Sequence, residues 1–402
     1  MRSITSMAAR AVIRPSAVSV GLLQTNRRAM ARYISLQAKT RRATIPRGSM
    51  RFPMLPPRRY INMQALWLPP VMFVGLLGAL WIWKCIMMVI FQNKIIYMPG
   101  MPPSARRERI AEYASRCGGV RWEERRITAA DSTDLALCVA RIEATGTAPA
   151  TSPAAAATPV YVLYFQGNAS SLPPRLEDLS WVLRDLQTRA PRARYTMICL
   201  SYRGYWTSRG RPSERGINID AQAALAYVSR LHGEEYPRGS GPEPVLVFWG
   251  QSIGSGIATN LAAWDGFPAG TRLHGLVLET VFTSVRDMLG AVYPPRWVPY
   301  RHLWPFLWNH LDSMANLERI ATRIGDRAPR ITIVEAGRDE LVPAEHGERL
   351  VRRGGELGLS IDKQTVPGAF HNDVMFKREG RKAAADAIER AVVDVTSEKH
   401  GG

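Results

Sequence analysis

Residues 245–256 read Val-Leu-Val-Phe-Trp-Gly-Gln-Ser-Ile-Gly-Ser-Gly, and the apolar stretch IATNLAAW follows at 257–264. A short apolar run, a Gly-x-Ser-x-Gly turn and a helical stretch predict a strand that passes through a sharp bend into a helix. Ser252 would then lie on a strained turn with its hydroxyl projecting beyond the sheet. Gly250 and Gly254 leave room where a Cβ would collide with the crossing backbone. This unit decides the class of fold.

The rest of the chain repeats the alternation of apolar runs and helical stretches. Continuous apolar strands between helices predict an α/β fold, with a mostly parallel central sheet covered by helices on both faces. We expect this domain to occupy residues 105–398. The predicted strands are 120–128, 133–142, 160–165, 195–202, 245–250, 276–279, 331–336 and 361–366, and the predicted helices are 173–189, 218–232, one from 253, and 379–397.

A serine hydroxyl is a poor nucleophile unless a base removes its proton and a carboxylate orients that base. Of the seven histidines, His371 stands in the loop Val-Pro-Gly-Ala-Phe-His-Asn-Asp, between the last predicted strand and the last helix. A histidine in this loop can reach over the carboxyl ends of the strands. We therefore expect His371 to be the general base for Ser252.

The carboxylate should follow the preceding strand, because the order of the three residues in this arrangement is Ser, then Asp or Glu, then His. Asp339 lies directly after the strand 331–336. Three other acids compete: Glu335 within that strand, Glu340 beside Asp339, and Glu279 at the end of the preceding strand. We expect Asp339, with Glu279 as the alternative.

A tetrahedral intermediate also needs two backbone N–H donors for its oxyanion. The residue after the nucleophile is Ile253, and the loop after the early strand reads Phe-Gln-Gly-Asn at 165–168. The predicted donors are the amides of Ile253 and Asn168. This chemistry uses no cofactor and no metal ion, and we expect neither.

The formal charge of +19 lies almost entirely at one end of the chain. The first 107 residues hold 17 lysines and arginines and no acid, which leaves 36 basic residues against 34 acidic ones. A nucleic-acid-binding domain would need basic residues clustered on its folded surface, so we expect no nucleic-acid partner. Residues 1–60 have the composition of a disordered basic leader or targeting arm.

An apolar segment predicts a membrane anchor at 66–91. Its core, 71–91, reads VMFVGLLGALWIWKCIMMVIF, long enough to span about 30 Å of hydrocarbon as a helix. Lys84 is the single charge, near enough to one end to reach the headgroups. The aromatic, proline-rich stretch 292–311 predicts a lid over a pocket, near 289–314.

Several motifs together resemble the membrane-anchored branch of α/β-hydrolase-domain proteins that includes the bud-emergence family. They are the QGNAS loop at 166–170, Tyr-Arg-Gly-Tyr at 202–205, the serine turn, Gly-Arg-Asp-Glu-Leu-Val-Pro at 337–343 and Phe-His-Asn-Asp at 370–373. The resemblance covers roughly 65–395 and implies the α/β-hydrolase fold, an N-terminal anchor and the same three catalytic residues. That family usually has His where this chain has Gln166, which we expect to tune the oxyanion site rather than remove it.

The favoured function is hydrolysis of a carboxylic ester or thioester, with a lipid or acyl-protein substrate and the lipid bilayer as partner. The alternative is a catalytically silent scaffold on the same fold, acting in cell polarity or morphology. The anchor predicts a single-pass protein of an endomembrane, such as the endoplasmic reticulum, or of the plasma membrane. If the leader is a mitochondrial signal, the inner mitochondrial membrane is the alternative.

Overall fold

The computed structural model describes residues 63–145, 157–237 and 241–398. The predicted leader at 1–60 lies outside this part of the chain. The described residues comprise the apolar helix and the α/β domain.

One eight-stranded sheet forms the centre of the domain, in the order β1-β2-β4-β3-β5-β6-β7-β8. Within the described residues only β2 runs antiparallel to its neighbours; the other pairs are parallel. The sheet is therefore mostly parallel, as the sequence predicted. The strands are β1 (Trp122–Thr128), β2 (Asp134–Ile142), β3 (Thr158–Phe165), β4 (Ala193–Ser201), β5 (Val245–Gln251), β6 (Leu273–Glu279), β7 (Arg330–Ala336) and β8 (Ile361–Val366).

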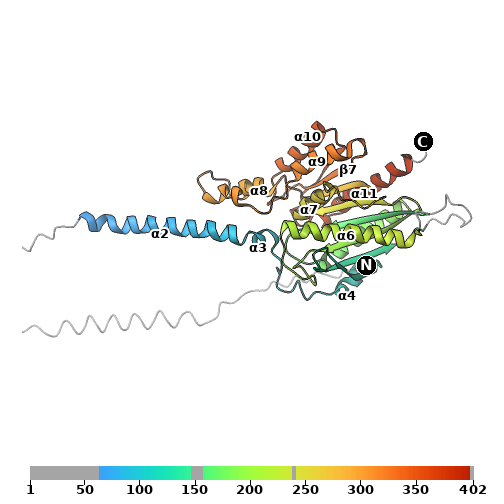
Figure 1. Ribbon diagram of the computed structural model, residues 1–402, viewed down its shortest axis with the longest axis horizontal. Coiled ribbons are helices and arrows are strands. Elements are labelled where there is room, and N and C mark those ends of the chain that lie inside the picture. The colour runs from blue at the N-terminus through green and yellow to red at the C-terminus, as the bar shows by residue number, and fades with distance from the viewer. Residues whose placement is uncertain (1–62, 146–156, 238–240, 399–402) are drawn as a thin grey trace, which may run out of the picture. The chain divides into compact units, whose positions relative to one another are not determined.

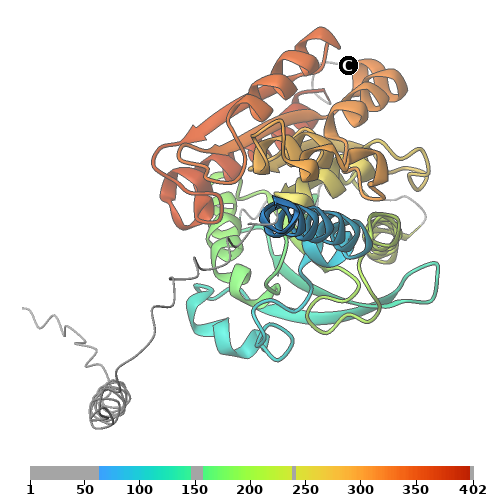
Figure 2. The ribbon, with the colours of Figure 1, turned by 90° about the vertical axis from the view of Figure 1, so that its left-hand side faces the viewer.

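Helices cover both faces of the sheet (Figures 1 and 2). Alternate residues of β3 point to opposite faces: Val162 joins one apolar cluster and Leu163 the other. The first cluster contains residues of α5 (Leu176–Arg189) and α11 (Arg378–Glu398). The second contains residues of α6 (Glu214–Glu235), α7 (Ile253–Ala262), α9 (Ser313–Ile324) and α10 (Glu345–Glu356).

Side-chain caps set the beginnings of three helices. Ser213 accepts a hydrogen bond of 3.2 Å from the amide of Gly216, so α6 begins at Glu214 and not at the predicted residue 218. Ser284 caps α8 (Val285–Val292), and Asp312 caps α9 in the same way. The prediction began α6 too late because the polar first turn of the helix interrupts the apolar periodicity.

The order of the strands creates a switch point beside β3. The chain passes from β3 to β4 on one side and then to β5 on the other, and Phe165 at the end of β3 lies opposite Gly250 of β5. Ligands of open parallel sheets bind outside the carboxyl ends of strands at such a point. This architecture is the α/β-hydrolase fold, and the switch point brings the two predicted oxyanion segments together.

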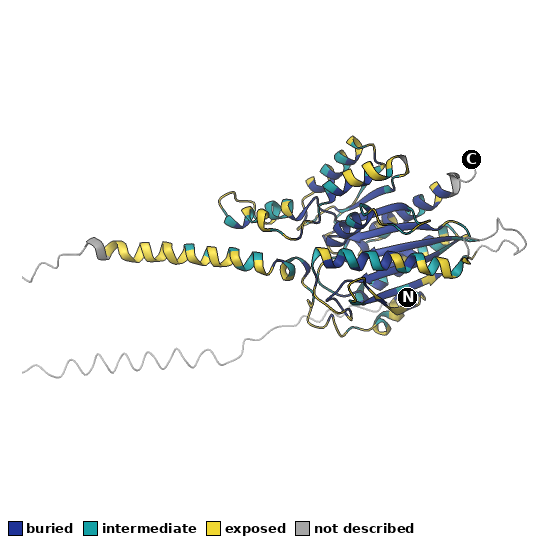
Figure 3. Cartoon of the chain, in the orientation of Figure 1, coloured by how far each residue is buried: buried dark blue, intermediate teal, exposed yellow. Residues whose placement is uncertain are grey.

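The apolar segment is one helix, α2 (Met63–Ile90), followed by the short helix α3 (Gln92–Tyr97). Residues 66–90 are long and apolar enough to cross a membrane by length and composition. Most side chains of this stretch are exposed, in contrast to the buried strands of the sheet (Figure 3). Lys84 places its ammonium group 4.4 Å from the centre of the Tyr300 ring.

Candidate active site

Ser252 lies in a strained turn between β5 and α7. Its backbone torsions are φ 52° and ψ −116°, a combination that residues with a side chain rarely adopt. Its amide donates a hydrogen bond of 2.8 Å to the carbonyl of Glu279, the last residue of the neighbouring strand β6. The sheet therefore holds the turn, and Ser252 is 8% exposed.

Gly250 and Gly254 allow this turn to approach the backbone on two sides. A Cβ at Gly254 would lie 2.1 Å from the carbonyl oxygen of Phe165, and one at Gly250 would lie 2.3 Å from that of Gly254. Neither distance is possible between real atoms, and backbone cannot move aside as a flexible side chain can. The structure therefore shows the backbone contacts that the sequence led us to expect at the two glycines.

Ser252, His371 and Asp339 form one hydrogen-bonded chain at the carboxyl edge of the sheet. Nε2 of His371 lies 3.0 Å from Oγ of Ser252. On its other side, Nδ1 of His371 lies 2.9 and 3.0 Å from the two carboxylate oxygens of Asp339. The three residues come from the loops after β8, β7 and β5, as the topology predicts.

Asp339 sits where its charged form is stabilised. Its Oδ1 accepts hydrogen bonds from the amides of Leu341 and Val342, at 2.9 and 2.8 Å. Burial favours the neutral acid, but the bonds from His371 and from the two amides outweigh burial and hold the pKa of Asp339 below its ordinary value. A charged carboxylate at this place favours the tautomer of His371 that carries its proton on Nδ1.

Glu279, the alternative acid, is fully buried beside the serine turn but is not hydrogen-bonded to His371. Burial raises the pKa of its carboxyl to about 7, against the opposing effects of Arg175 and of a hydrogen bond from the Trp249 indole. Its Oε1 has no hydrogen-bond partner among the described residues. The geometry therefore favours Asp339, and leaves Glu279 as a buried carboxyl that titrates near neutral pH.

The two other acids weighed from sequence have different contacts. Glu335 pairs with Lys363 at 3.0 Å, on the neighbouring strand β8. Glu340 accepts a hydrogen bond of 3.0 Å from the backbone N–H of His371. Glu340 therefore holds the loop that carries the histidine, a role that sequence reasoning missed because it depends on a backbone contact across two loops.

Two contacts with neighbouring strand ends hold the loop after β3. Tyr202 donates its hydroxyl proton to the carbonyl of Gln166 at 2.8 Å, and the amide of Gly167 lies 3.4 Å from Oε1 of Gln251. Among the described residues the backbone amide of Asn168 has no hydrogen-bond acceptor. Ile253 is the first residue of α7, where the helix offers its amide no partner of its own.

The end of α3 and the chain just after it support this loop by hydrogen bonds, a contact that sequence reasoning also missed. The amide of Ala169 donates to the carbonyl of Tyr97 at 3.1 Å, and the amide of Ser170 donates to the carbonyl of Met101 at 2.5 Å. Tyr97 is fully buried, and the hydroxyl of Tyr205 also donates to its carbonyl. The segment that leaves the apolar helix is therefore part of the support of the candidate oxyanion loop.

Gln166 replaces the histidine that the resemblance leads one to expect. Its side chain is 2% exposed, and neither its Oε1 nor its Nε2 has a hydrogen-bond partner among the described residues. The contact that fixes position 166 is made by its backbone carbonyl. The substitution therefore changes buried side-chain polarity while the backbone path of the loop stays supported.

The aromatic stretch 292–311 contains two short 3₁₀ helices and joins α8 to α9. Its end is fixed by the buried side chain of Asn309, which hydrogen-bonds to Gln92, Asn93 and Tyr97 of α3. The predicted lid therefore lies against the helix that follows the apolar segment. Its action as a lid over the substrate stays a prediction.

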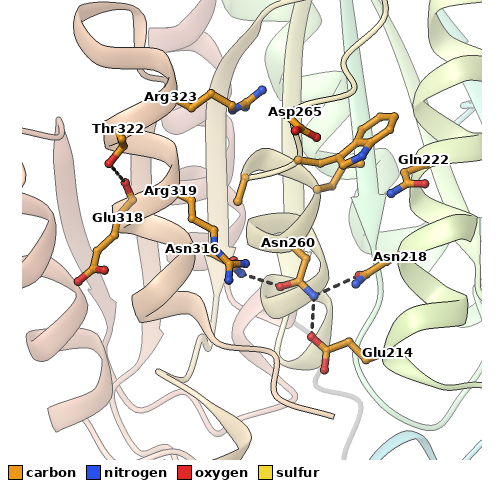
Figure 4. A pocket seen from close by; sticks show the side chains of 13 residues that line it. Glu214, Asn218, Gln222, Asn260, Asp265, Asn316, Glu318, Arg319, Thr322 and Arg323 are labelled. Atoms are coloured by element: carbon orange, nitrogen blue, oxygen red, sulfur yellow. Dashed lines mark hydrogen bonds between the residues drawn. The ribbon is translucent and has the colours of Figure 1, made fainter. Parts of the chain in front are cut away.

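A polar hollow of about 680 Å³ lies between α6, α7 and α9 (Figure 4). At its centre, Asn260 donates hydrogen bonds to Glu214 and Asn218 and accepts one from Asn316. Neither Ser252 nor His371 lines it. These side chains form hydrogen bonds with one another. They link the three helices and add no group to the candidate active site.

Comparison with known proteins gives relatives of the predicted kind. No protein-family model matches the chain. An uncharacterized protein of Mycobacterium tuberculosis, Rv2307c, is 34% identical over 199 residues, which are 50% of this chain and 60% of that protein. Protein bem46 of Schizosaccharomyces pombe is 29% identical over 53% of this chain and 61% of its own length. The predicted resemblance to the bud-emergence family is confirmed.

A third relative is lysophosphatidylserine lipase ABHD12 of Danio rerio, 33% identical over 39% of this chain and 38% of that protein. The chain thus spans about three fifths of the first two relatives and less of the third. Among solved structures, an alpha-beta hydrolase from Vibrio vulnificus covers 76% of this chain with a TM-score of 0.49 and 18% identity. The assignment of the fold rests on the sheet order and the serine turn described above.

Proposed function

We propose that this chain is a membrane-anchored serine hydrolase that cleaves a carboxylic ester or thioester through an acyl-enzyme. The observation that carries the proposal is the hydrogen-bonded chain in which Nε2 of His371 lies 3.0 Å from Oγ of Ser252 while Nδ1 faces Asp339. This is the arrangement that makes a serine hydroxyl nucleophilic. The strained turn supports the proposal, because it presents that hydroxyl at the edge of the sheet.

In the first half-reaction, Oγ of Ser252 forms a bond to the acyl carbon while its proton passes to Nε2 of His371. The negative charge of Asp339 stabilises the imidazolium that results. Collapse of the tetrahedral intermediate breaks the bond to the alcohol or thiol, which leaves with the proton from His371. Water then repeats the sequence on the acyl-enzyme and releases the acid.

The amides of Ile253 and Asn168 are the proposed donors to the oxyanion. Ile253 begins α7, so the positive end of that helix adds to the stabilisation of the developing charge. The support of the loop by Tyr97 and Met101 would keep the second donor in place before the substrate arrives. A donor held in advance needs no reorganisation during the reaction, which is why such a hole is effective.

A lipid ester or an acyl-protein is the proposed substrate class. The relative named a lysophosphatidylserine lipase acts on a lipid ester, and the apolar helix at 66–90 would hold this chain at a bilayer. We propose the division predicted from sequence, an anchor at 66–91 and a hydrolase domain at 105–398 with a lid near 289–314. The proposed location is a single-pass protein of an endomembrane or the plasma membrane, with the inner mitochondrial membrane as alternative.

Labelling with a fluorophosphonate probe tests the proposal on the full chain in membranes. Such probes react with an activated serine, so we expect labelling that Ser252→Ala abolishes. Ser360→Ala, at an exposed serine, is the matched control and should label like the unsubstituted chain. A folded chain that stays unlabelled would instead favour the scaffold without turnover.

A further inference from the structure

The aromatic stretch 292–311 exposes an unusual amount of apolar surface. Trp297 is 70% exposed, Trp308 61% and Phe306 58%. Val292 and Trp304 of the same segment are also exposed, at 57% and 43%. Several large apolar side chains gathered on one short segment mark a surface that is covered by a partner.

This segment touches the apolar helix within its candidate span. The ring centres of Trp81 and Trp297 lie 5.8 Å apart, and the ammonium group of Lys84 lies over the ring of Tyr300. Further along, a crevice of about 70 Å³ separates the two elements. Its walls are apolar apart from Gln92 and include Met88 and Val89 from the helix and Leu303, Phe306 and Leu307 from the segment.

These contacts fix the depth of the segment along α2. At a rise of ~1.5 Å per residue, Trp81 lies about 14 Å and Lys84 about 9 Å from the end of the helix at Ile90. A hydrocarbon layer is about 30 Å thick, so these levels belong to the half nearer the α/β domain. If residues 66–90 span a bilayer, a segment that touches Trp81 and Lys84 lies in the same half.

Side chains of the segment form hydrogen bonds with several of its backbone carbonyls, which suits surroundings poor in water. Nη1 of Arg301 lies within 3.3 Å of three carbonyl oxygens, those of Gly290, Tyr293 and Pro294. Nε2 of His302 lies 2.8 Å from the carbonyl oxygen of Arg296. Irregular backbone in a membrane has to satisfy its polar groups internally, and Arg301 and His302 do so for the carbonyls of Tyr293, Pro294 and Arg296 in this segment.

We propose that residues 292–311 insert into the bilayer beside α2, with Trp297, Phe306 and Trp308 among the acyl chains and the headgroup boundary. This inference rests on the proposed membrane anchoring by α2. The partner is the lipid bilayer, because the surface continues that of the anchor and carries aromatic rings, which concentrate at membrane interfaces. Lys84 then has an aromatic partner, which offsets part of the cost of a charge in the span.

Fluorescence quenching in phosphatidylcholine vesicles tests the insertion with the full chain. A thiol-reactive fluorophore is attached at Phe306→Cys in the segment, at Leu76→Cys in α2, or at Trp181→Cys on α5. The three parent side chains are all exposed, at 58%, 71% and 43%. The unsubstituted chain gives the background from its native cysteines, and two quenchers are used, a lipid with a spin label on its acyl chain and aqueous iodide.

We expect the spin-labelled lipid to quench the fluorophores at 306 and 76 several-fold more than the one at 181, and iodide to show the reverse order. Lipid quenching at 76 with iodide quenching at 306 would overturn the insertion while leaving the anchor intact. Iodide quenching at both positions would overturn insertion and anchoring together. Fluorophosphonate labelling of the same samples reports the hydrolase proposal separately.

Discussion

The serine turn and the aromatic segment 292–311 are the two irregular parts of this molecule that matter for its proposed function. In the turn, a Cβ at Gly254 would lie 2.1 Å from a backbone oxygen, so the surrounding backbone excludes any residue other than glycine at this position. In the segment, Trp297 leaves 70% of its surface exposed, and hydrogen bonds from Arg301 hold the backbone. The first conformation is imposed by packing within the chain, whereas the second is suited to surroundings outside it.

The largest effect should come from the acid behind the histidine. Asp339→Asn keeps the shape but stabilises the wrong tautomer of His371, so we expect ester turnover to fall by about 10⁴-fold. Glu279→Gln is the matched control and should change turnover by less than about tenfold, because Glu279 does not contact His371. Initial rates on a soluble ester provide the measurement. A severe loss in the second variant with activity retained in the first would assign the acid to Glu279.

The next effect concerns the packing of the turn. Gly254→Ala forces a methyl group against the carbonyls of Phe165 and Gln166. We expect it to lower the free energy of unfolding by about 3 kcal/mol or more, measured by urea denaturation in detergent. Gly233→Ala on α6 meets no atom within 4 Å and should raise it by about 1 kcal/mol. Equal stabilities for the two variants would contradict the steric account.

Glu279 makes the stability of the same region depend on pH. Its pKa is about 7 in the folded chain against an ordinary 4.5, so between these values the folded state keeps a proton that the unfolded state has released. The free energy of unfolding should therefore fall as pH rises through this window, by about 3 kcal/mol in all.

Glu279→Gln removes the titrating group and should flatten this part of the pH dependence. The measurement is the urea midpoint from pH 4 to pH 8, compared with the unsubstituted chain. Glu356→Gln, at an exposed carboxyl at the end of α10, is the control and should keep the original slope. Parallel curves for the Glu279 variant and the unsubstituted chain would show that this carboxyl does not titrate there.

The smallest effect should come from the aromatic segment, because its side chains do not touch the reacting atoms. Replacing Trp297 and Trp308 together with alanine should lower activity on an ester embedded in vesicles on the order of tenfold. Activity on a short soluble ester should change less than about twofold, since the serine turn is untouched. Trp181→Ala serves as the control. Equal losses on both substrates would indicate damage to the fold instead of lost lipid contact.

The sheet was predictable from sequence because buried parallel strands are continuous apolar runs. β8 was placed at its observed residues, and the others within a few residues of theirs. Helix ends were less predictable, as at α6, since a polar first turn after Ser213 hides the start from any apolar pattern. The order of the strands did not follow from the pattern, because it depends on contacts between distant segments.

The candidate site also contains residues that could be predicted from sequence and residues that could not. Ser252, Asp339 and His371 could be named because each side chain type follows a strand in a required order. Glu340 and Tyr97 could not be named from sequence. Glu340 binds a backbone N–H, and Tyr97 contributes its backbone carbonyl, a group that every residue has. The raised pKa of Glu279 also escaped prediction, since burial at the end of β6 is a property of the folded chain.

The support of the candidate oxyanion loop by Tyr97 and Met101 has a practical consequence for separating the α/β domain from the proposed membrane anchor. A protease that cut just after Met101 would shed the α/β domain with its three catalytic candidates intact but without the two carbonyls that hold Ala169 and Ser170. A soluble fragment intended to keep its activity should therefore begin no later than Gln92, where α3 starts. The proposed membrane attachment and the proposed turnover then depend on one stretch of chain, and a cut that ends the first should weaken the second.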